Sequence, residues 1–368
     1  MSKSIKVCFL IPSLSDVSPV NAAISMALGL KENFNVTLLS YDRISDLTKK
    51  SALNEKGLHV ASLEAGGIRD IMKAKSALTD MTSDAGFDVI ISMLFRCDML
   101  LAMADIKSKK ISSLRNMFYD EYRISYGRIL GCFFYKLHSV FLSRLDAVVC
   151  MSDDMYDFFS STLRNSNVSI KKIYNFLDED RVLKQISEVS GEDVFLGREY
   201  PTVISVSSLI PRKRVDIILE VCLELYGDGV YFYLDIVGSG SEFERLALQA
   251  ATSPNGKKLI QFHGYSDNPI KYLYNANIFV MASESEGVSR SLMEALYLNK
   301  ICVVSDIPGN REFSRKSRGV SLFNSRAMFK EQLVQSLNEG EASFLPLEYM
   351  RKCALNEYTS LINDICRS

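Results

Sequence analysis

Long apolar runs are absent from this sequence of 368 residues. None of its apolar stretches approaches the 18 residues that a membrane-spanning helix requires, so we expect no segment to cross a bilayer. The first apolar run, residues 7–11, is too short for the core of a signal peptide, and no small-residue cleavage site follows it. A buried first strand is the better interpretation of residues 6–11.

Closely spaced cysteines and histidines are also absent. The eight cysteines are scattered without a single C-x-x-C pair, and most of them lie in apolar runs. This distribution predicts reduced, buried thiols in a cytoplasmic protein, and it argues against disulfides or a zinc site. The three histidines lie far apart in the sequence, so a histidine-based metal site is not expected.

The sequence has no overall excess of positive or negative charge, because 43 basic and 44 acidic residues leave a formal net charge of −1. The exception is the stretch 107–144, which holds eight basic and two acidic residues. A basic cluster in a nearly neutral protein indicates an anionic partner at one surface.

What the sequence does contain is an alternation of short strand-like runs with helical patterns such as residues 22–31 and 214–225. The strand-like runs are often apolar throughout, as parallel sheets covered on both faces require. They are residues 6–11, 35–40, 88–94, 146–152, 202–208, 231–238, 278–283 and 301–306. The alternation predicts an α/β fold of two Rossmann-like, doubly wound parallel-sheet domains that face a cleft, with the polar stretch 187–201 as a linker.

Open parallel sheets bind ligands beyond the carboxyl ends of their strands, so the strand-to-helix turns are the candidate sites. The turn after strand 202–208 holds Arg212, Lys213 and Arg214. Cations beside a helix N-terminus suit a phosphate group. The alternative is a solvated basic turn without a ligand.

A second turn follows strand 231–238 and contains Gly238 and Gly240, which would let a ligand approach the backbone closely. A dinucleotide fingerprint would require a third glycine at Phe243, so a nicotinamide-dependent enzyme is not favoured. A simple tight turn is the alternative.

A third turn begins at Ser283 and contains Glu286, and a helix follows that carries Glu294. Both carboxylates can face a ligand while the amides of residues 287–291 point at a bound anion. A carboxylate suits the vicinal hydroxyls of a ribose. The alternative is that Glu286 only favours a helix N-terminus and that Glu294 is merely exposed. For the Pro-Gly turn in 305–313 the alternative is plain turn chemistry.

Together these pieces resemble the C-terminal half of the large GT-B-type family of retaining glycosyltransferases. Its hallmark is a pair of glutamates with seven residues between them, followed by a strand and a Pro-Gly turn. The matching sequences here are EGVSRSLMEA (286–295) and VVSDIPGNRE (303–312). Further similar segments are FHGY (262–265), IYNFLD (173–178), ISSLRNMFYDEY (111–122) and ALNEYTSLINDI (354–365).

The resemblance implies an acceptor-binding first domain at 1–178, a nucleotide-sugar-binding second domain at 179–350 and a final helix, 351–368, that returns to the first domain. It implies that Glu294 binds the nucleotide ribose, while Glu286 contacts the donor sugar and Lys213 binds the diphosphate as the catalytic candidates. The further donor-binding candidates are Gly287, Val288, Ser289, Arg290, Ser291, Ser208, Arg212, Gly238, His263, Gly264 and Tyr265.

Two departures from the family pattern affect the expected site. Ser208 stands where the family has an arginine that partners the lysine, and Arg212, Arg214 or Arg290 is the candidate replacement. The glycine-rich loop of the first domain is also missing, with residues 13–23 in its place. The candidates for the acceptor side are Asn21, Arg115, Asp120 and Glu121, for which structural ion pairs are the alternative.

The activity implied by the resemblance is retaining, metal-independent transfer of a hexose-type sugar to a glycan or polyprenyl-linked acceptor, in surface polysaccharide synthesis. Cationic side chains stabilise the leaving diphosphate, so no cofactor is expected, and a UDP-sugar is favoured over a GDP-sugar as donor. No nucleic-acid partner is expected. The alternatives are a nucleotide-sugar epimerase or hydrolase of the same architecture and, because of Ser208, a non-catalytic nucleotide-sugar-binding protein.

The stretch 122–145 mixes aromatic and aliphatic residues with four basic ones. Two interpretations stay open for it. It is either a helix that lies on the anionic inner face of the cell membrane or a buried helix whose basic ends reach the solvent.

Overall fold

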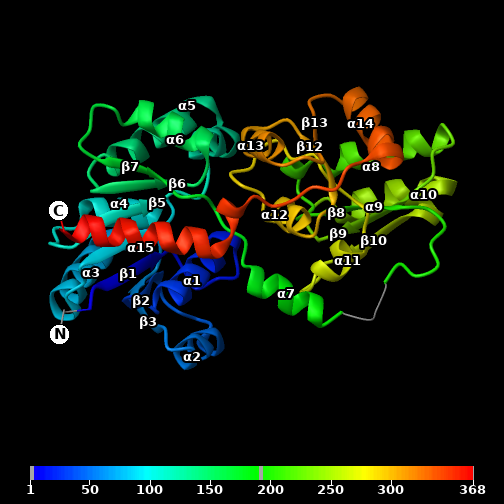
Figure 1. Ribbon diagram of the computed structural model, residues 1–368. Coiled ribbons are helices and arrows are strands. Elements are labelled where there is room, and N and C mark those ends of the chain that lie inside the picture. The colour runs from blue at the N-terminus through cyan, green and yellow to red at the C-terminus, as the bar shows by residue number, and fades with distance from the viewer. Residues whose placement is uncertain (1–3, 190–193, 368) are drawn as a thin grey trace. The chain divides into compact units, whose positions relative to one another are not determined.

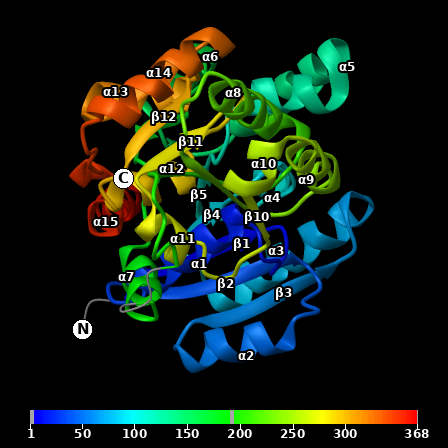
Figure 2. The same ribbon diagram turned by 90° about the vertical axis from the view of Figure 1, so that its right-hand side faces the viewer.

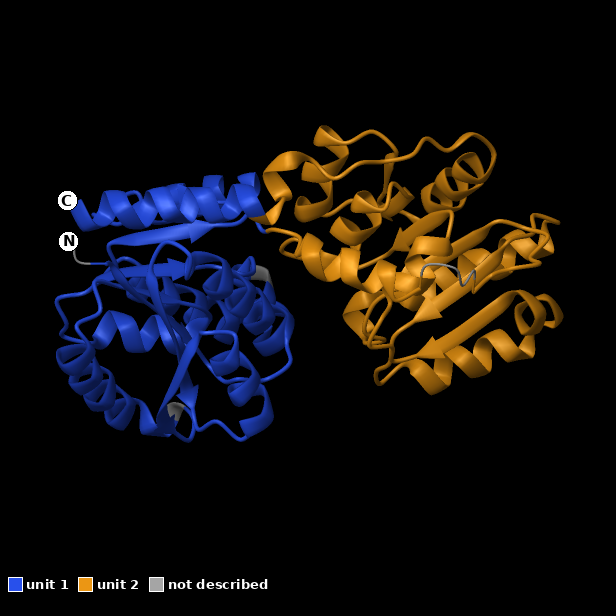
Figure 3. Ribbon diagram, turned by 60° about the horizontal axis from the view of Figure 1, so that its bottom comes forward, with its two compact units in different colours: residues 1–175, 352–368 blue, residues 176–351 orange. Residues whose placement is uncertain are grey.

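The computed structural model describes residues 4–189 and 194–367 of the chain (Figure 1). The chain divides into two compact units, unit 1 with residues 1–175 and 352–368 and unit 2 with residues 176–351 (Figure 3). Of the expected linker 187–201, residues 190–193 lie outside the described residues.

Unit 1 is built on a seven-stranded parallel sheet with the order β3-β2-β1-β4-β5-β6-β7. The central strand β1 pairs with β2 and β4, and its residues from Val7 to Ile11 are fully buried. The order of the strands reverses between β1 and β4. The strands are β1 (Lys6–Ile11), β2 (Asn35–Asp42), β3 (His59–Ala65), β4 (Val89–Ser92), β5 (Lys109–Ser113), β6 (Ala147–Cys150) and β7 (Ser169–Lys172).

Unit 2 is built on a six-stranded parallel sheet with the order β10-β9-β8-β11-β12-β13, which reverses between β8 and β11. Its core joins strand residues such as Val203 and Ile236 to helix residues such as Ile218 and Leu333, all of them fully buried. The strands are β8 (Thr202–Val206), β9 (Tyr233–Val237), β10 (Ile260–Gly264), β11 (Ile278–Met281), β12 (Ile301–Ser305) and β13 (Val320–Phe323).

Helices connect the parallel strands in both units. In unit 2 the side chains of Ser289 and Ser325 cap α12 and α14 by accepting a hydrogen bond from the backbone N–H three residues later. The helices of unit 1 are α1 (Ser18–Leu30), α2 (Leu47–Glu55), α3 (Ile71–Ala85), α4 (Phe95–Met103), α5 (Phe118–Leu142) and α6 (Asp153–Thr162). Those of unit 2 are α7 (Glu179–Ser187), α8 (Val215–Gly227), α9 (Phe243–Thr252), α10 (Pro254–Leu259), α11 (Ile270–Asn275), α12 (Arg290–Tyr297), α13 (Pro308–Lys316) and α14 (Arg326–Glu339). Short 3-10 turns are η1 (Ile68–Asp70), η2 (Pro211–Lys213) and η3 (Leu347–Tyr349).

The C-terminal helix α15 (Arg351–Arg367) packs against unit 1 along most of its length (Figure 3). The hydroxyl of the buried Tyr358 lies 2.7 Å from the Oγ of Ser113 at the end of β5. The side chain of Leu355 fills the space beside Gly29, where a Cβ would lie 2.5 Å from it. The last segment of the chain therefore belongs to the core of the unit that holds the first.

The predicted fold class is confirmed, because both units are parallel α/β sheets with intervening helices. Each of the eight strands expected from apolar runs is present. The runs did not reveal β3, β5, β7 or β13, and β10 was found only through the resemblance. Three of the missed strands are sheet edges with one paired neighbour, and β5 begins with two lysines, so none shows a continuous apolar run.

The stretch 122–145, expected to be helical, lies mostly within α5, but α5 is not one continuous helix. The segment α5 contains a residue with non-helical backbone angles, Gly127 (φ 76°, ψ 175°), which separates two helical arms. A glycine adopts this left-handed φ without the steric cost that a Cβ would bring. In the described part of the chain, none of the helices combines the length and apolar character needed to cross a membrane.

The eight cysteines are all free, and five of them are buried. Burial raises the pKa of Cys150 and Cys302 to about 12. These thiols therefore stay protonated at neutral pH, when they are poor nucleophiles.

Candidate active site

The candidate site of unit 2 lies at the carboxyl ends of β8 and β11, the neighbouring strands between which the strand order reverses. The loop after β8 carries Arg212 and Lys213, and the loop after β11 carries Glu286. The backbone N–H of Glu284 donates to the carbonyl oxygen of Arg212 at 3.0 Å, which ties the two loops together. Open parallel sheets bind their ligands at this reversal, so the topology itself singles out these loops.

Lys213 and Glu286 form an ion pair at the centre of this site. The Nζ of Lys213 donates to the Oε1 of Glu286, and the two side chains are only 14% and 12% exposed. The Nη1 of Arg212 lies 3.8 Å from the same oxygen and donates to the carbonyl oxygen of Ser285. Two cations therefore converge on one carboxylate. A diphosphate offers several anionic oxygens, so it can take the place of Glu286 beside both cations.

Arg214, the third cation of the β8 loop, has its own partners. It adopts a left-handed backbone conformation (φ 48°), and its guanidinium lies 3.2 Å from Asp216 and 2.9 Å from Glu284. The hydrogen bond to Asp216 is the main reason that the pKa of Arg214 is raised. Arg212 is therefore a candidate replacement for the charge missing at Ser208, because it lies beside the same Glu286 oxygen as Lys213.

The loop that contains Gly287 and Val288 ends at the N-terminus of α12. The buried Oγ of Ser289 accepts the N–H of Leu292 at 3.4 Å and lies 3.2 Å from the Oγ of Ser291. This cap occupies one of the N–H groups that a helix start leaves without a partner inside the helix. Arg290 is the first residue of the helix, so its charge is carried at the anion-attracting end.

Gly309, in the Pro-Gly turn after β12, supports the same loop. A Cβ at Gly309 would lie 2.2 Å from the carbonyl oxygen of Gly287. The Oγ of Ser305 also donates to the carbonyl oxygen of Ser283 at 2.7 Å, so the end of β12 holds the end of β11. The turn in 305–313 therefore does more than reverse the chain, because it lets α13 lie against the backbone of the Glu286 loop.

Glu294 lies inside α12 with its side chain only 5% exposed, and its partner is a residue that the sequence analysis missed. The Nη2 of Arg181 donates to the Oε1 of Glu294, and its Nη1 donates to the Oε1 of Gln185 at 2.8 Å. Both Arg181 and Gln185 belong to α7. A buried carboxylate needs a cation or hydrogen-bond donors, and α7 supplies them here. The sequence pattern showed neither that Glu294 would be buried nor which helix would supply its partner.

The glycine turn after β9 packs against the β8 loop. A Cβ at Gly238 (φ +143°) would lie 1.8 Å from the carbonyl oxygen of Ser207, and one at Gly240 would lie 2.3 Å from that of Leu209. The exposed Ser208 sits between these two contacts. Both glycines are thus required by the protein's own backbone, which is the tight-turn explanation for them.

His263, at the end of β10, is held by the fully buried Asp235 of β9. The same carboxylate receives Arg198, whose Nη2 donates to it at 3.1 Å, and the ring of Tyr272 lies 4.3 Å from that of His263. Gly264 follows with a positive φ of 70°, and Tyr265 is 69% exposed. Of this group, Tyr265 is exposed and Gly264 is half-buried, while His263 is held by the buried Asp235.

The acceptor-side candidates lie in unit 1. The Nδ2 of Asn21 in α1 donates to Asp16 at 2.5 Å, and the Nη1 of the buried Arg115 donates to Asn175 at 3.3 Å. Glu121 in α5 accepts the Nδ2 of Asn116 at 2.7 Å. Asp120 lies in the same helix, and its side chain is outside the described ones. These candidates follow β1 and β5 and make contacts that a structural role also explains.

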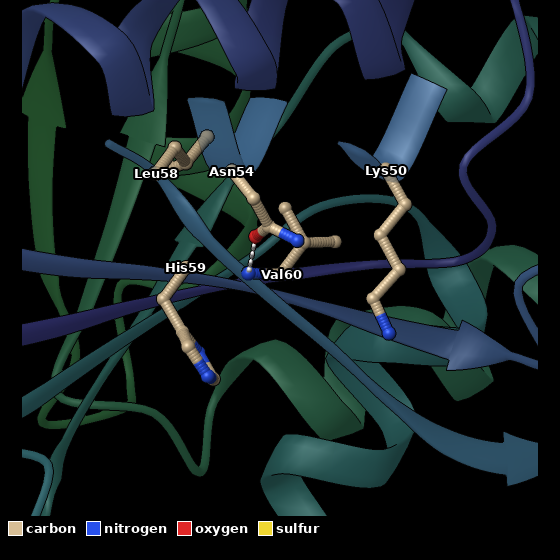
Figure 4. Close-up of a pocket in the computed structure, with 5 residues that line it drawn as sticks. All are labelled: Lys50, Asn54, Leu58, His59 and Val60. Carbon is tan, nitrogen blue, oxygen red and sulfur yellow. Dashed lines mark hydrogen bonds between the residues drawn. The ribbon is translucent and has the colours of Figure 1, made fainter. Parts of the chain in front are cut away.

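A surface depression of about 540 Å³ elsewhere in unit 1 contains none of the predicted residues (Figure 4). It is lined by Lys50, Asn54, Leu58, His59 and Val60. The Oδ1 of Asn54 accepts the backbone N–H of Val60 at 3.2 Å, which explains the asparagine as a local support for the edge strand β3 (Figure 4). Within the described residues, no group of three or more potential ligands could hold a metal ion.

The chemistry of these loops suits an anionic, sugar-containing ligand. Arg212 and Lys213 carry the positive charge that phosphate oxygens require, and Glu286 and Glu294 carry oxygens that can accept hydrogen bonds from hydroxyl groups. Residues 192–353, which contain these four residues, match the family described as Glycosyl transferases group 1.

The curated relatives of the chain are bacterial enzymes of low identity. An O-antigen biosynthesis glycosyltransferase, WclY of Escherichia coli, is 22% identical over 229 residues, which are 60% of this chain and 62% of the relative. An N-acetyl-alpha-D-glucosaminyl L-malate synthase of Bacillus anthracis is 20% identical over 237 residues, 61% of each chain. The chain thus spans about six-tenths of the length of these relatives.

Solved structures match almost the whole chain in fold. Anabaena HepE in complex with UDP and glucose has a TM-score of 0.71 at 13% identity, covering 98% of this chain and 95% of HepE. The pneumococcal O-GlcNAc transferase GtfA in complex with UDP and GlcNAc has a TM-score of 0.70 at 12% identity, covering 99% and 100%. TarM has a TM-score of 0.74 at 11% identity, covering 98% and 99%. These likenesses establish the two-sheet GT-B fold.

Proposed function

We propose that this chain is a retaining glycosyltransferase that moves a hexose-type sugar from a UDP-sugar to a glycan or polyprenyl-linked acceptor during bacterial glycan synthesis. The observation that carries the proposal is the Lys213–Glu286 pair at the reversal of the unit 2 sheet, backed by Arg212 and followed by the buried Glu294. The names of the relatives support it, since they include an O-antigen glycosyltransferase and structures with bound UDP.

Donor binding in this proposal is an exchange of partners. The diphosphate takes Lys213 and Arg212 from Glu286, and the freed carboxylate accepts hydroxyl groups of the donor sugar. In the same way the ribose hydroxyls donate to Glu294 and loosen its bond to Arg181. Each exchange replaces one hydrogen-bonded charge pair by another, so buried charges are not left without partners.

The transfer step then depends on charge stabilisation. As the bond from the sugar to the diphosphate breaks, negative charge grows on the leaving phosphate, where Lys213, Arg212 and the N-terminus of α12 lie ready to receive it. In the retaining mechanism of this proposal the acceptor attacks from the face that the phosphate leaves, and the leaving phosphate accepts the acceptor's proton. Glu286 holds the sugar in place for that attack.

The test is product analysis with a panel of UDP- and GDP-sugars and a lipid-linked glycan acceptor, by mass spectrometry and by NMR of the new anomeric centre. The expected result is a product that keeps the anomeric configuration of a UDP-sugar donor, and loss of product in Glu286→Gln. Inverted configuration would overturn the retaining assignment. Release of free or epimerised sugar without transfer would identify a hydrolase or epimerase, and nucleotide-sugar binding without any turnover would identify a non-catalytic protein.

A further inference from the structure

The α5 segment of unit 1 is a helical hairpin. Its first arm, residues 118–126, and its second arm, residues 128–142, meet at Gly127. A Cβ at Gly131 would lie 2.6 Å from the carbonyl oxygen of Tyr122, so only glycine allows the two arms to pack this closely. Figure 2 shows α5 projecting beyond the strands of its own unit.

Aromatic side chains join the arms and fix their base. Tyr119 faces Tyr135 with ring centroids 5.0 Å apart, and Tyr126 faces Phe134 at 4.9 Å. Near the base, His138 lies 3.1 Å from the hydroxyl of Tyr122 and 2.9 Å from the Oδ2 of the fully buried Asp98 in α4. The base of the hairpin is therefore anchored in unit 1, and aromatic contacts join its two arms.

The outer end of the hairpin exposes large apolar side chains. Ile129 is 88% exposed, and four neighbours within residues 124–133 are exposed by more than half. Those neighbours are Ile124, Tyr126, Leu130 and Phe133. Scattered exposed apolar residues are ordinary, but five within ten residues on one hairpin form a contiguous apolar tip, which marks an interaction surface.

Basic residues surround the apolar tip. Arg123, Arg128 and Lys136 lie within the hairpin, and the sequence from residue 122 to 145 contains no aspartate or glutamate. Among the described residues, Arg128 and Lys136 form no salt bridge, whereas Arg123 lies over the ring of Tyr119 at 5.2 Å. The tip thus offers apolar side chains for burial and free positive charge around them.

We propose that the hairpin tip, residues 123–136, docks on an anionic lipid bilayer. Apolar side chains at the tip enter the interface between head groups and acyl chains, while the basic residues meet the negative head groups. A second copy of this chain is a poorer occupant, because it would bring Arg123, Arg128 and Lys136 of two molecules together. The proposal concerns unit 1 alone and does not depend on the transferase function proposed for unit 2.

The absence of tryptophan from the chain allows a direct test. In Ile129→Trp the only indole of the protein sits at the tip, and in Leu248→Trp it sits at a matched exposed leucine (68% exposed) on α9 of unit 2. With vesicles of phosphatidylcholine and phosphatidylglycerol at low salt, we expect a blue-shifted emission that lipid-borne quenchers reduce for Ile129→Trp only. An unshifted emission of Ile129→Trp, or equal shifts in both variants, would overturn the proposal.

Vesicle flotation separates the apolar and the electrostatic contributions. Ile129→Glu combined with Phe133→Glu should reduce binding at least roughly tenfold, since it removes the buried apolar area. Arg128→Gln and Lys136→Gln should each reduce it about fivefold at low salt, and pure phosphatidylcholine vesicles should bind weakly. The control Leu248→Glu should bind as the parent protein does. Binding that persists in the tip double variant contradicts the proposal, as does no binding by the parent protein.

Two further measurements keep the outcome interpretable. Light scattering without lipid should give the same mass for the parent protein and the Ile129→Glu/Phe133→Glu variant, whereas a mass that falls on substitution would assign the tip to self-association. Thermal denaturation and UDP affinity should be unchanged in that variant, because the substituted side chains are exposed and lie in the other unit. A failure of vesicle binding with intact UDP binding therefore rejects the docking surface and leaves the proposed function standing.

Discussion

The donor loops of unit 2 and the α5 hairpin of unit 1 are both rich in basic residues, but they treat charge in opposite ways. In the loop after β8, Arg212, Lys213 and Arg214 each lie beside an acidic side chain, as Lys213 lies beside Glu286 and Arg214 beside Asp216. On the hairpin Arg128 and Lys136 have no acid within the surrounding stretch. Paired charge in a fixed loop fits a small ligand that exchanges with the pair, whereas unpaired charge beside exposed apolar residues fits an extended anionic surface.

Among the substitutions that test this comparison, we expect the largest effect on the transfer rate from a change at Glu286. Glu286→Gln keeps the shape of the side chain but removes its charge, and we expect the transfer rate to fall roughly 10²- to 10³-fold. The control is Glu284→Gln in the same loop, whose side chain is half exposed and pairs with Arg214. Steady-state kinetics measure both. If the two variants lose the same amount, the loop acts only through its general conformation and Glu286 has no special role.

A smaller effect is expected on nucleotide affinity at Lys213. Lys213→Ala should weaken UDP binding by about 10- to 100-fold, the usual range for a hydrogen bond to a charged group. Arg214→Ala is the matched variant in the next position, where the guanidinium already has two acids, and it should change affinity much less. Titration calorimetry measures the UDP affinity of both variants. An equal loss at Arg214 would mean that Arg214, rather than Arg212, replaces the charge missing at Ser208.

The support of the Glu286 loop can be broken without touching a charge. Gly309→Ala places a Cβ against the carbonyl oxygen of Gly287 and should lower the free energy of unfolding by about 1–3 kcal/mol. Gly227→Ala, at the end of α8, meets no atom within 4 Å and should leave stability unchanged or slightly higher. Urea denaturation compares the two. Equal stability of both variants would show that the turn after β12 does not hold the loop.

The smallest expected effect concerns Arg181, which competes with a ribose for Glu294. Because the arginine is partly exposed, Arg181→Gln should strengthen UDP binding only about twofold to fivefold. Lys184→Gln on the same helix, whose side chain is largely exposed, should leave the affinity unchanged. Weaker binding in Arg181→Gln would mean that the arginine holds Glu294 in position for the ribose and does not compete with it.

Most of the fold, and the charged turns of the candidate site, could be predicted from the sequence. Apolar strands such as residues 6–11 and 278–283 are recognisable because they are buried on both faces, and the charged turns follow them directly. Edge strands such as β7 were not recognisable, because their exposed lysines break the apolar pattern. The contact of Arg181 with Glu294 joins segments far apart in the sequence, and no local pattern encodes it.

The α5 hairpin shows a different limit of prediction from the sequence. Its aromatic and basic content was visible in the sequence, but its shape depends on Gly127 and Gly131, whose roles appear only when the two arms are placed together. A continuous helix and a hairpin have the same composition. The sequence left a membrane-lying helix and a buried helix both open, and the structure instead has a hairpin whose exposed apolar residues gather at one end.

The central claim is that the loops at the reversal of the unit 2 sheet hold a nucleotide-sugar donor. Titration of UDP-sugars into the parent protein and into Glu294→Gln tests it most directly, because the proposed function assigns Glu294 to the nucleotide ribose. We predict saturable binding of at least one UDP-sugar to the parent protein and a clear loss of affinity in Glu294→Gln, with both proteins equally folded. Undiminished binding in the variant, or no binding of any nucleotide sugar to the parent protein, would contradict the account.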